Sequence, residues 1–263
     1  MINEWKDRWA LVTGASAGIG KALARELAAG GTNLVLSARR RDRLDALALE
    51  LSSKYGIKAE VVVADLARPA APEEIFQFTQ AKQIEIALLV NNAGFGQYGD
   101  FYTIETDRLL QMVQVNCAAV LHLTRLYLPQ MVAKRSGDVL IVASTASFQA
   151  VPYISTYAAS KVFDLYLAEG LAEEMKPYGI RVCALCPGTT TSEFHDIAAH
   201  PAHSKGREQS AETVARNGLK ALAAGKSYVI SGLGNYLGAH GERLVPRRFV
   251  TRIAAKMFRP PGK

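Results

Sequence analysis

The fold of this 263-residue chain is decided by Thr13-Gly14-Ala15-Ser16-Ala17-Gly18-Ile19-Gly20. An apolar run, residues 10–13, precedes this stretch, and a helix-like segment, residues 18–29, follows it. Glycines permit a tight turn and close approach of the backbone, and a helix N-terminus offers free N–H groups to a phosphate. The spacing is G-x-x-x-G-x-G rather than the commoner G-x-G-x-x-G, and a glycine loop alone could be a structural turn. Its place between a strand and a helix favours binding of a nucleotide.

Strand-like apolar runs alternate with helix-length segments along the rest of the chain. Near-continuous apolar strands separated by helices predict an α/β fold with one doubly wound parallel sheet of about seven strands and helices on both faces. No linker or repeat interrupts the pattern, so residues 1–263 are predicted to form a single domain. Strands are expected at residues 10–13, 33–38, 59–64, 86–91, 138–144, 180–186 and 227–230, and helices at residues 18–29, 41–54, 73–82, 105–115, 117–134, 156–176 and 211–224.

The formal charge of +7 is concentrated near the C-terminus. Residues 239–263 contain seven basic side chains and one acid, and the rest of the chain is close to neutral. The body of the fold is therefore not expected to bind nucleic acid. No apolar stretch approaches the roughly 20 residues that span a bilayer, and the charged residues 1–9 do not resemble a signal peptide. A cytoplasmic protein is the expectation.

Cysteine and histidine give no sign of a metal site. The three cysteines are Cys117, Cys183 and Cys186, and an odd number does not suggest a disulfide framework. Cys183 and Cys186 lie in a strand-like run, where residues three apart point to opposite faces, so we expect small core side chains. The histidines at 195, 200 and 203 match no strong zinc spacing.

The end of the second strand discriminates between dinucleotides. NAD-binding proteins usually place an acid there for the ribose 2′-hydroxyl, but this chain reads Ser37-Ala38-Arg39-Arg40-Arg41. Guanidinium groups suit a 2′-phosphate, so NADP(H) is the expected cofactor. Arg39 is predicted to bind the phosphate and Arg40 to stack on adenine, whereas Arg41 is expected to begin the next helix. A solvated basic helix start is the alternative.

Polar residues also follow the third and fourth strands. Asp65-Leu66 places a carboxylate where the adenine amino group could donate to it. Asn91-Asn92-Ala93-Gly94 closes the fourth strand, and its asparagines suit either a turn or the lining of a cofactor site.

Tyr157-Ala158-Ala159-Ser160-Lys161 places a phenol and an ammonium on one face of a helix. A free phenol has a pKa of about 10, and a nearby cation favours the phenolate. The pair is therefore suited to proton transfer, although tyrosine and lysine also meet on many exposed helices.

Taken in order, these motifs resemble those of the short-chain dehydrogenase/reductase family. They are Thr13-Gly14-x-x-x-Gly18-x-Gly20, Asp65, Asn91-Asn92-Ala93-Gly94, Asn116, Ser144, Tyr157-x-x-x-Lys161 and Pro187-Gly188. The resemblance covers residues 9–192. It implies a Rossmann-type sheet and an NADP-dependent oxidoreductase that transfers hydride between the nicotinamide and a carbonyl or alcohol carbon.

The resemblance also implies roles for individual residues. Tyr157 would donate a proton to the carbonyl oxygen, Lys161 would lower the pKa of Tyr157 and bind the nicotinamide ribose, and Ser144, rather than the nearby Ser147, would orient the substrate. Asn116 would hold a water that links Lys161 to solvent. The expected cofactor-binding residues are Gly14, Ser16, Ala17, Gly18, Ile19, Gly20, Arg39, Arg40, Asp65, Leu66, Asn92, Ala93, Gly94, Tyr157, Lys161, Pro187, Gly188, Thr189 and Thr191.

The segment after Pro187-Gly188 is expected, by the same resemblance, to form a substrate lid over about residues 189–210. A pocket that is apolar and aromatic suits a hydrophobic ketone, a 3-ketoacyl compound or a steroid-like molecule better than a sugar. Its predicted lining is Phe95, Phe148, Val151, Tyr153, Ile154 and Phe194.

Residues 247–259 are predicted to form a basic amphipathic helix. Its apolar side chains fit either packing on the protein's own body or a second subunit, or contact with an anionic membrane surface. This tail resembles that of a branch that includes long-chain 3-ketoacyl reductases, and relatives suggest a homodimer or homotetramer. A non-catalytic NADP(H)-binding sensor and a membrane-surface interaction protein are the alternative functions. The complete set of Asn116, Ser144, Tyr157 and Lys161 argues against a pure binder.

Overall fold

One parallel sheet organises the computed structural model, which describes residues 2–191 and 208–260 and leaves the Arg243 side chain undescribed. The sheet has seven strands within those ranges, in the order β3-β2-β1-β4-β5-β6-β7, and every pair is parallel. The predicted α/β fold class is therefore confirmed. The strands are β1 (Trp9–Thr13), β2 (Asn33–Ala38), β3 (Ala59–Val63), β4 (Ile86–Asn91), β5 (Gly137–Val142), β6 (Ile180–Cys186) and β7 (Tyr228–Ile230).

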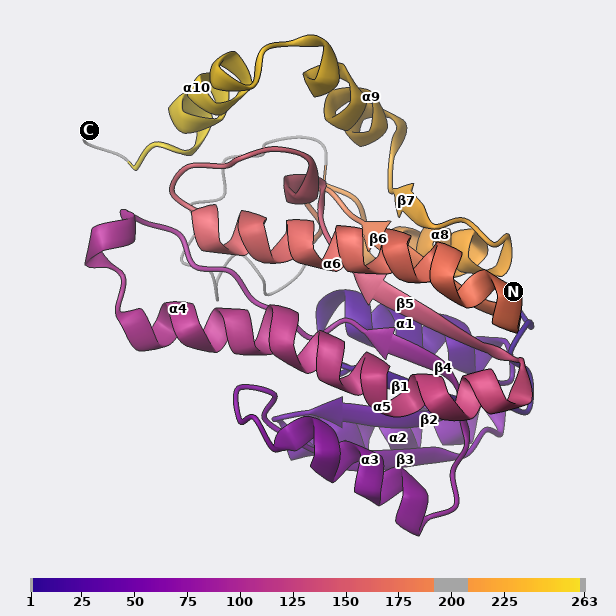
Figure 1. Ribbon diagram of the computed structural model, residues 1–263. Coiled ribbons are helices and arrows are strands. Elements are labelled where there is room, and N and C mark those ends of the chain that lie inside the picture. The colour runs from indigo at the N-terminus through magenta and orange to yellow at the C-terminus, as the bar shows by residue number, and fades with distance from the viewer. Residues whose placement is uncertain (1, 192–207, 261–263) are drawn as a thin grey trace.

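Helices cover both faces of the sheet (Figure 1). One core joins the sheet to α1 (Gly18–Ala29), α2 (Arg41–Tyr55) and α8 (Ala211–Ala223). The other core joins the opposite face to α3 (Ala71–Ala81), α5 (Ala119–Lys134) and α6 (Ser155–Met175). In the described ranges the remaining helices are α4 (Thr106–Val113), α9 (Leu233–Gly241) and α10 (Arg247–Phe258), and short 3₁₀ turns occupy Phe101–Thr103, Thr145–Phe148, Lys176–Tyr178 and Glu242–Leu244.

The observed element boundaries agree with the predicted ones within two residues, with two differences in kind. The two helices expected between residues 105 and 134 form one continuous run, joined by a π-helical turn at Gln114–Ala118. Helix α9 was not predicted, because Gly234, Gly238 and Gly241 disfavour a helix in so short a segment.

Strand β6 shows how one apolar strand serves two cores. Cys183 belongs to the core with α1, and Cys186 belongs to the core with α6. Both thiols are free and fully buried, and burial raises the pKa of Cys183 to about 12. The structure therefore confirms that these two cysteines are core side chains on opposite faces.

A buried ionic network closes the edge of the sheet at which β5 and β6 begin. Asp138 on β5 is 2 % exposed and lies directly opposite Arg181 on β6. Arg181 donates from Nε and Nη2 to the two Asp138 carboxylate oxygens, at 2.6 and 2.9 Å. The indole Nε1 of the fully buried Trp5 also donates to Asp138, at 2.7 Å. Arg181 also donates to Glu4 at 2.9 Å, so the N-terminal segment is tied to the sheet by the Trp5–Asp138 hydrogen bond and by the Glu4–Arg181 ion pair.

We expect Asp138→Asn to lower the free energy of unfolding by about 3 kcal/mol, because it removes the buried counter-charge of the Arg181 guanidinium and leaves only the more exposed Glu4. The measurement is urea denaturation followed by tryptophan fluorescence. Glu85→Gln is the control, since it removes an exposed ion pair with Lys134 and should cost no more than about 1 kcal/mol. Equal losses in the two variants would contradict this assignment.

Candidate active site

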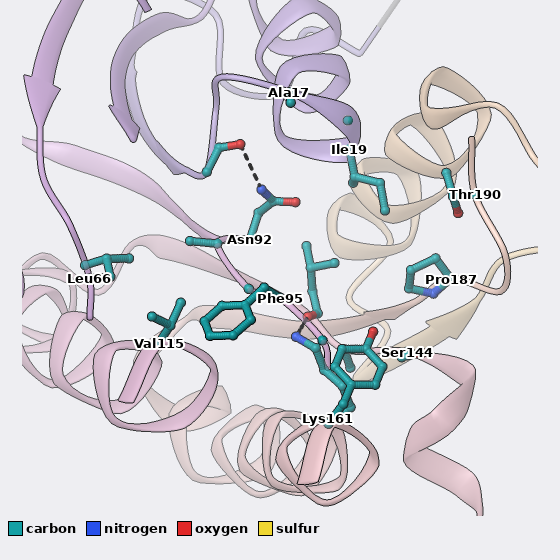
Figure 2. A pocket seen from close by; sticks show the side chains of 18 of the residues that line it. Ala17, Ile19, Leu66, Asn92, Phe95, Val115, Ser144, Lys161, Pro187 and Thr190 are labelled. Atoms are coloured by element: carbon teal, nitrogen blue, oxygen red, sulfur yellow. Dashed lines mark hydrogen bonds between the residues drawn. The ribbon is translucent and has the colours of Figure 1, made fainter. Parts of the chain in front are cut away.

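A cavity of about 610 Å³ opens at the carboxyl ends of the strands. A volume of this size suits a cofactor or a drug-sized ligand. Its walls come from the segments that follow β1 through β6, with contributions from α4, α6 and α10. Figure 2 shows part of this lining. In a parallel sheet all these segments meet at the same edge, where open α/β sheets bind ligands.

The glycine loop forms one wall of the cavity. Gly14 has φ +66°, in the left-handed region that favours glycine, and a Cβ on Gly20 would lie 2.3 Å from the Gly14 carbonyl oxygen. Helix α1 begins just after this turn without a side-chain cap, so the N–H groups of its first turn are left for another acceptor. Ala17 and Ile19, which flank the start of α1, both line the cavity (Figure 2). This arrangement is suited to a diphosphate.

Hydrogen bonds between the ends of β1 and β4 fix this wall in place. The Asn92 amide donates to the Thr13 carbonyl at 2.8 Å, and the Thr13 hydroxyl accepts from the backbone N–H groups of Asn92 and Ala93 at 3.0 and 3.1 Å. Asn92 also lines the cavity, whereas the Asn91 amide points into the core and donates to Thr124. Asn92 therefore both holds the chain after β4 in place and lines the cavity.

Guanidinium groups surround the end of the cavity near β2. Arg40 donates from Nε and Nη2 to the Ser16 hydroxyl, at 3.3 and 3.1 Å, and so bridges the end of β2 to the glycine loop. Arg39 lines the same region with an exposed side chain. Arg108 of α4 stacks over the Phe95 ring at 4.1 Å and donates to Gln97, and its pKa is lowered by partial burial and by the charge of Arg39. Among the described lining residues Asp65 is the only acid, so this end of the cavity is suited to an anion.

Ser144, Tyr157 and Lys161 come together at the other end of the cavity, on the rim formed by β5 and α6. The Ser144 hydroxyl accepts from the Ala146 backbone N–H at 3.1 Å and hydrogen-bonds the Tyr157 phenol. Ser147, the alternative to Ser144, is buried and donates to the Lys161 carbonyl at 2.6 Å, so it does not line the cavity. Figure 2 shows Ser144 and Lys161 at this end of the cavity.

A buried carboxylate accompanies the lysine. The Lys161 ammonium donates to the Val142 carbonyl at 2.8 Å and to Asp164 at 2.9 Å. Asp164 is fully buried, and its second carboxylate oxygen has no hydrogen-bond partner among the described residues. Burial lowers the pKa of Lys161, but the charge and hydrogen bond of Asp164, together with Tyr157, outweigh burial. The pKa of Lys161 therefore lies above its ordinary value. The lysine is therefore held as a cation beside the phenol.

Four effects compete at Tyr157. Burial raises the pKa of the phenol, Lys161 and the Ser144 hydrogen bond lower it, and Asp164 raises it again. The net direction is upward, although the sequence predicts a lowered pKa. Lys161 does act in the predicted direction, but desolvation is the larger effect and Asp164 offsets part of the lysine charge. A phenol with a raised pKa is protonated at neutral pH and can donate its proton.

Asn116 supports the site from behind the cavity wall. It is fully buried in the π-helical turn, donates to the Phe95 carbonyl and the Ser160 hydroxyl, and accepts from the Phe95 N–H. These bonds tie the loop after β4 to α6. The water that Asn116 was expected to hold stays a prediction.

Several predicted residues lie away from the cavity. Phe148 packs on Tyr228 and on His240 of α9. Tyr153 has φ +67°, and its carbonyl accepts a hydrogen bond from the Gly99 N–H. Thr191 donates to Glu208, and its neighbour Thr190 lines the cavity instead. Gly20 and Val151 are likewise absent from the lining, although Gly20 shapes the loop. Phe194, the three histidines at 195, 200 and 203, and most of the predicted lid lie outside the described residues.

The other predicted lining residues do meet at the cavity. They are Gly14, Ser16, Ala17, Gly18, Ile19, Arg39, Arg40, Asp65, Leu66, Asn92, Ala93, Gly94, Phe95, Ser144, Ile154, Tyr157, Lys161, Pro187, Gly188 and Thr189.

Sequence reasoning missed several residues of this site besides Thr190. Arg108, Met257 and Phe258 line the cavity, and Asp164 holds the lysine. Asp164 was detectable in principle, since an acid three residues after Lys161 lies on the same helix face. Arg108 and the two α10 residues arrive through tertiary packing and leave no local signal. In the described part of the chain no group of three or more His, Cys, Asp or Glu could hold a metal ion.

Known proteins resemble this chain in sequence and in fold. Residues 8–200 match the family described as short chain dehydrogenase. Hydroxysteroid dehydrogenase-like protein 1 of Gallus gallus is 38 % identical over 184 residues, which are 68 % of this chain and 55 % of that protein. Very-long-chain 3-oxoacyl-CoA reductase of Anas platyrhynchos is 37 % identical over 196 residues, which are 72 % of this chain and 62 % of that protein. The chain thus spans little more than half the length of these relatives.

Solved structures match over nearly the whole chain. A short-chain dehydrogenase from Sphingobium yanoikuyae in complex with NADPH has a TM-score of 0.83 at 28 % identity, and the match covers 97 % of this chain and 98 % of that one. A 7beta-hydroxysteroid dehydrogenase has a TM-score of 0.87 at 26 % identity, with 96 % and 98 % covered. The family match extends over the glycine loop, the strand ends and the Ser144, Tyr157 and Lys161 cluster, and with it the chain belongs to the short-chain dehydrogenase/reductase family.

Proposed function

We propose that this chain is an NADP(H)-dependent oxidoreductase that interconverts an apolar carbonyl compound and its alcohol. The observation that carries the proposal is the arrangement of one cavity, with guanidinium groups and an open helix N-terminus at one end and Ser144, Tyr157 and Lys161 at the other. A dinucleotide with a 2′-phosphate matches both ends. The NADPH in a solved relative of similar fold supports the same choice.

The residues present fit such a cofactor. The backbone at Gly14 and Gly20 leaves no room for side chains, as a wall that receives a diphosphate requires. Arg39 would hold the 2′-phosphate through charge-assisted hydrogen bonds, and Arg40, which Ser16 already orients, would lie against the adenine. Lys161 and Tyr157 would face the nicotinamide ribose. When bound, the nicotinamide supplies or accepts the hydride.

The protein's own contribution is to orient the carbonyl and to provide the proton. The Ser144 hydroxyl would hydrogen-bond the substrate oxygen and fix its position. The Tyr157 phenol would donate its proton to that oxygen as negative charge develops on it. Lys161, kept positive by Asp164, would stabilise the phenolate that remains.

The substrate is proposed to be apolar. Phe95, Val115, Ile154, Met257 and Phe258 contribute apolar surface to the cavity. The names of the relatives, a 3-oxoacyl-CoA reductase and hydroxysteroid dehydrogenases, support a 3-ketoacyl or steroid-like ketone. The test is NADPH oxidation by the purified protein with a panel of bulky ketones, 3-ketoacyl thioesters and ketosteroids, with sugars as the polar comparison. Turnover of the sugars alone would contradict an apolar substrate.

Tyr157→Phe should lower kcat by about 10²–10⁴-fold, because it removes only the proton donor. The affinity for NADPH, measured by fluorescence titration, should stay within a few-fold of the wild type. Tyr166→Phe is the matched control, since Tyr166 lies on the same helix with an exposed ring and should leave kcat unchanged. Near-normal turnover by Tyr157→Phe would rule out Tyr157 as the acid.

Arg39→Ala should weaken NADPH binding by about 10- to 100-fold, the range for loss of one charge-assisted hydrogen bond, and should leave NADH binding nearly unchanged. Arg41→Ala is the control, because Arg41 starts α2 with an exposed side chain next to Asp45. Both affinities are measured by quenching of protein fluorescence. Equal losses for the two cofactors would show that Arg39 does not contact the 2′-phosphate.

Asp164→Asn should move the high-pH limb of carbonyl reduction to lower pH. Asp164 raises the pKa of both Lys161 and Tyr157. Without its negative charge, the coupled pair of Tyr157 and Lys161 loses its first proton at lower pH, whether the phenol or the ammonium releases it. Reduction needs that proton, and activity is therefore lost at lower pH. The measurement is the pH dependence of kcat.

Asp164→Glu keeps the charge and should retain the wild-type limb even if packing lowers the rate. If Asp164→Asn reduced kcat by the same factor at every pH, the carboxylate would have only a structural role.

A further inference from the structure

The last two helices carry an exposed apolar surface that the body of the protein does not cover. On α9 it consists of Leu233, Tyr236 and Leu237, and it continues through Leu244 to α10. On α10 it consists of Phe249, Ile253 and Met257, which are 43, 57 and 67 % exposed. These three side chains are spaced four residues apart and so form one stripe along the helix. Figure 1 shows α9 and α10 outside the layers of the sheet and its covering helices.

A second stripe of α10, about 100° around the helix from the first, is covered by the protein. Ala254 is 3 % exposed, Val250 is half-buried, and Phe258 lines the cavity. These residues are also spaced four apart. The apolar residues of the predicted amphipathic helix therefore divide into two stripes, one docked and one exposed, and docking on the protein's own body accounts for only half of them.

A line of cations runs beside the exposed stripe. Arg248, Arg252 and Lys256 repeat at the same spacing and are all exposed. Residues 243–263 contain no acid at all, and the nearest one, Glu242, is only partly exposed and has one buried carboxylate oxygen. An apolar stripe flanked by a cationic stripe is the pattern of a helix that lies in the interface of a membrane.

Charge decides between a lipid surface and a second copy of the chain. A two-fold pairing of α10 with itself would bring the same cations of both copies together, and like charges in contact oppose association. An anionic lipid surface satisfies the cationic stripe and the apolar stripe at once. No helix in the described ranges is both long and apolar enough to cross a bilayer, so the contact would be a peripheral one.

We propose that the exposed face of α9 and α10 binds peripherally to an anionic lipid membrane. The position of this face would link membrane binding to substrate access, an inference that rests on the function proposed above. Met257 belongs to the exposed stripe and also lines the cavity, so the membrane-facing surface adjoins the mouth of the site. An apolar substrate dissolved in the membrane would then reach the cavity without passing through water.

The test is co-sedimentation of the full chain with vesicles, in the absence of cofactor and substrate. One vesicle population is phosphatidylcholine alone, and the other contains phosphatidylglycerol as well. We expect binding to the anionic vesicles at least tenfold tighter than to the neutral ones. Equal binding to both, or binding to neither, would overturn the proposal.

Two charge-reversal variants separate this face from the overall basic charge. Arg248→Glu with Arg252→Glu should weaken anionic vesicle binding by at least tenfold. Lys220→Glu with Lys226→Glu changes the net charge equally at exposed positions on and after α8, and it should bind like the wild type. Equal losses in the two variants would show that net charge, and not this face, drives binding. Thermal unfolding midpoints of the variants verify that both are folded.

The apolar stripe is tested separately. Ile253→Ser should weaken vesicle binding several-fold, whereas Leu49→Ser, at an exposed leucine of α2, should not. Sedimentation velocity on the same proteins detects the competing outcome: if Ile253→Ser splits a wild-type oligomer, a second copy covers the face and the membrane proposal fails. Because vesicle binding is measured without turnover, it can fail while the reductase activity stands, and the reverse also holds.

Discussion

The site depends on a constraint set by the parallel sheet. The strand order reverses between β1 and β4, so the chain leaves these two neighbouring strands toward opposite faces and a crevice opens between their ends. The Thr13 and Asn92 hydrogen bonds span that boundary and hold the glycine loop against the end of β4. Since the loop positions α1, and α1 begins at the cavity, these bonds determine where a diphosphate could lie.

A second dependence links the proton donor to the core. Tyr157 contacts the cavity directly, but its proton affinity is set by groups behind it. Lys161 is held by the carbonyl at the end of β5 and by Asp164, and neither is accessible to solvent. Burial alone would favour a neutral lysine, and the buried carboxylate opposes this. The cluster therefore works as a coupled unit, in which a change at Asp164 is felt at Tyr157 although only Tyr157 would contact the substrate.

Much of this could be predicted from the sequence, because the relevant signals are local. The glycine loop, the strand ends and the Tyr157 and Lys161 spacing are each contained in a few consecutive residues. The pocket residues were harder to predict. Phe148 was predicted to line the pocket because it is aromatic and near Ser144. Its ring instead packs against those of Tyr228 and His240, which lie far along the chain. Arg108, Met257 and Phe258 reach the cavity from helices whose placement only tertiary packing decides.

The C-terminal helix shows why periodicity alone could not settle its role. The sequence offered docking and membrane contact as alternatives, since both require an apolar stripe. The structure shows two stripes, offset around the helix, so the two roles do not compete for the same side chains. Packing on the protein does not account for the exposed Phe249 and Ile253, which lie beside three exposed cations. A helix that only met a membrane would have no use for the buried Ala254 or for Phe258 in the cavity wall. Because α10 lines the cavity with one stripe and exposes the other, it would connect the cavity to a membrane bound at its outer face.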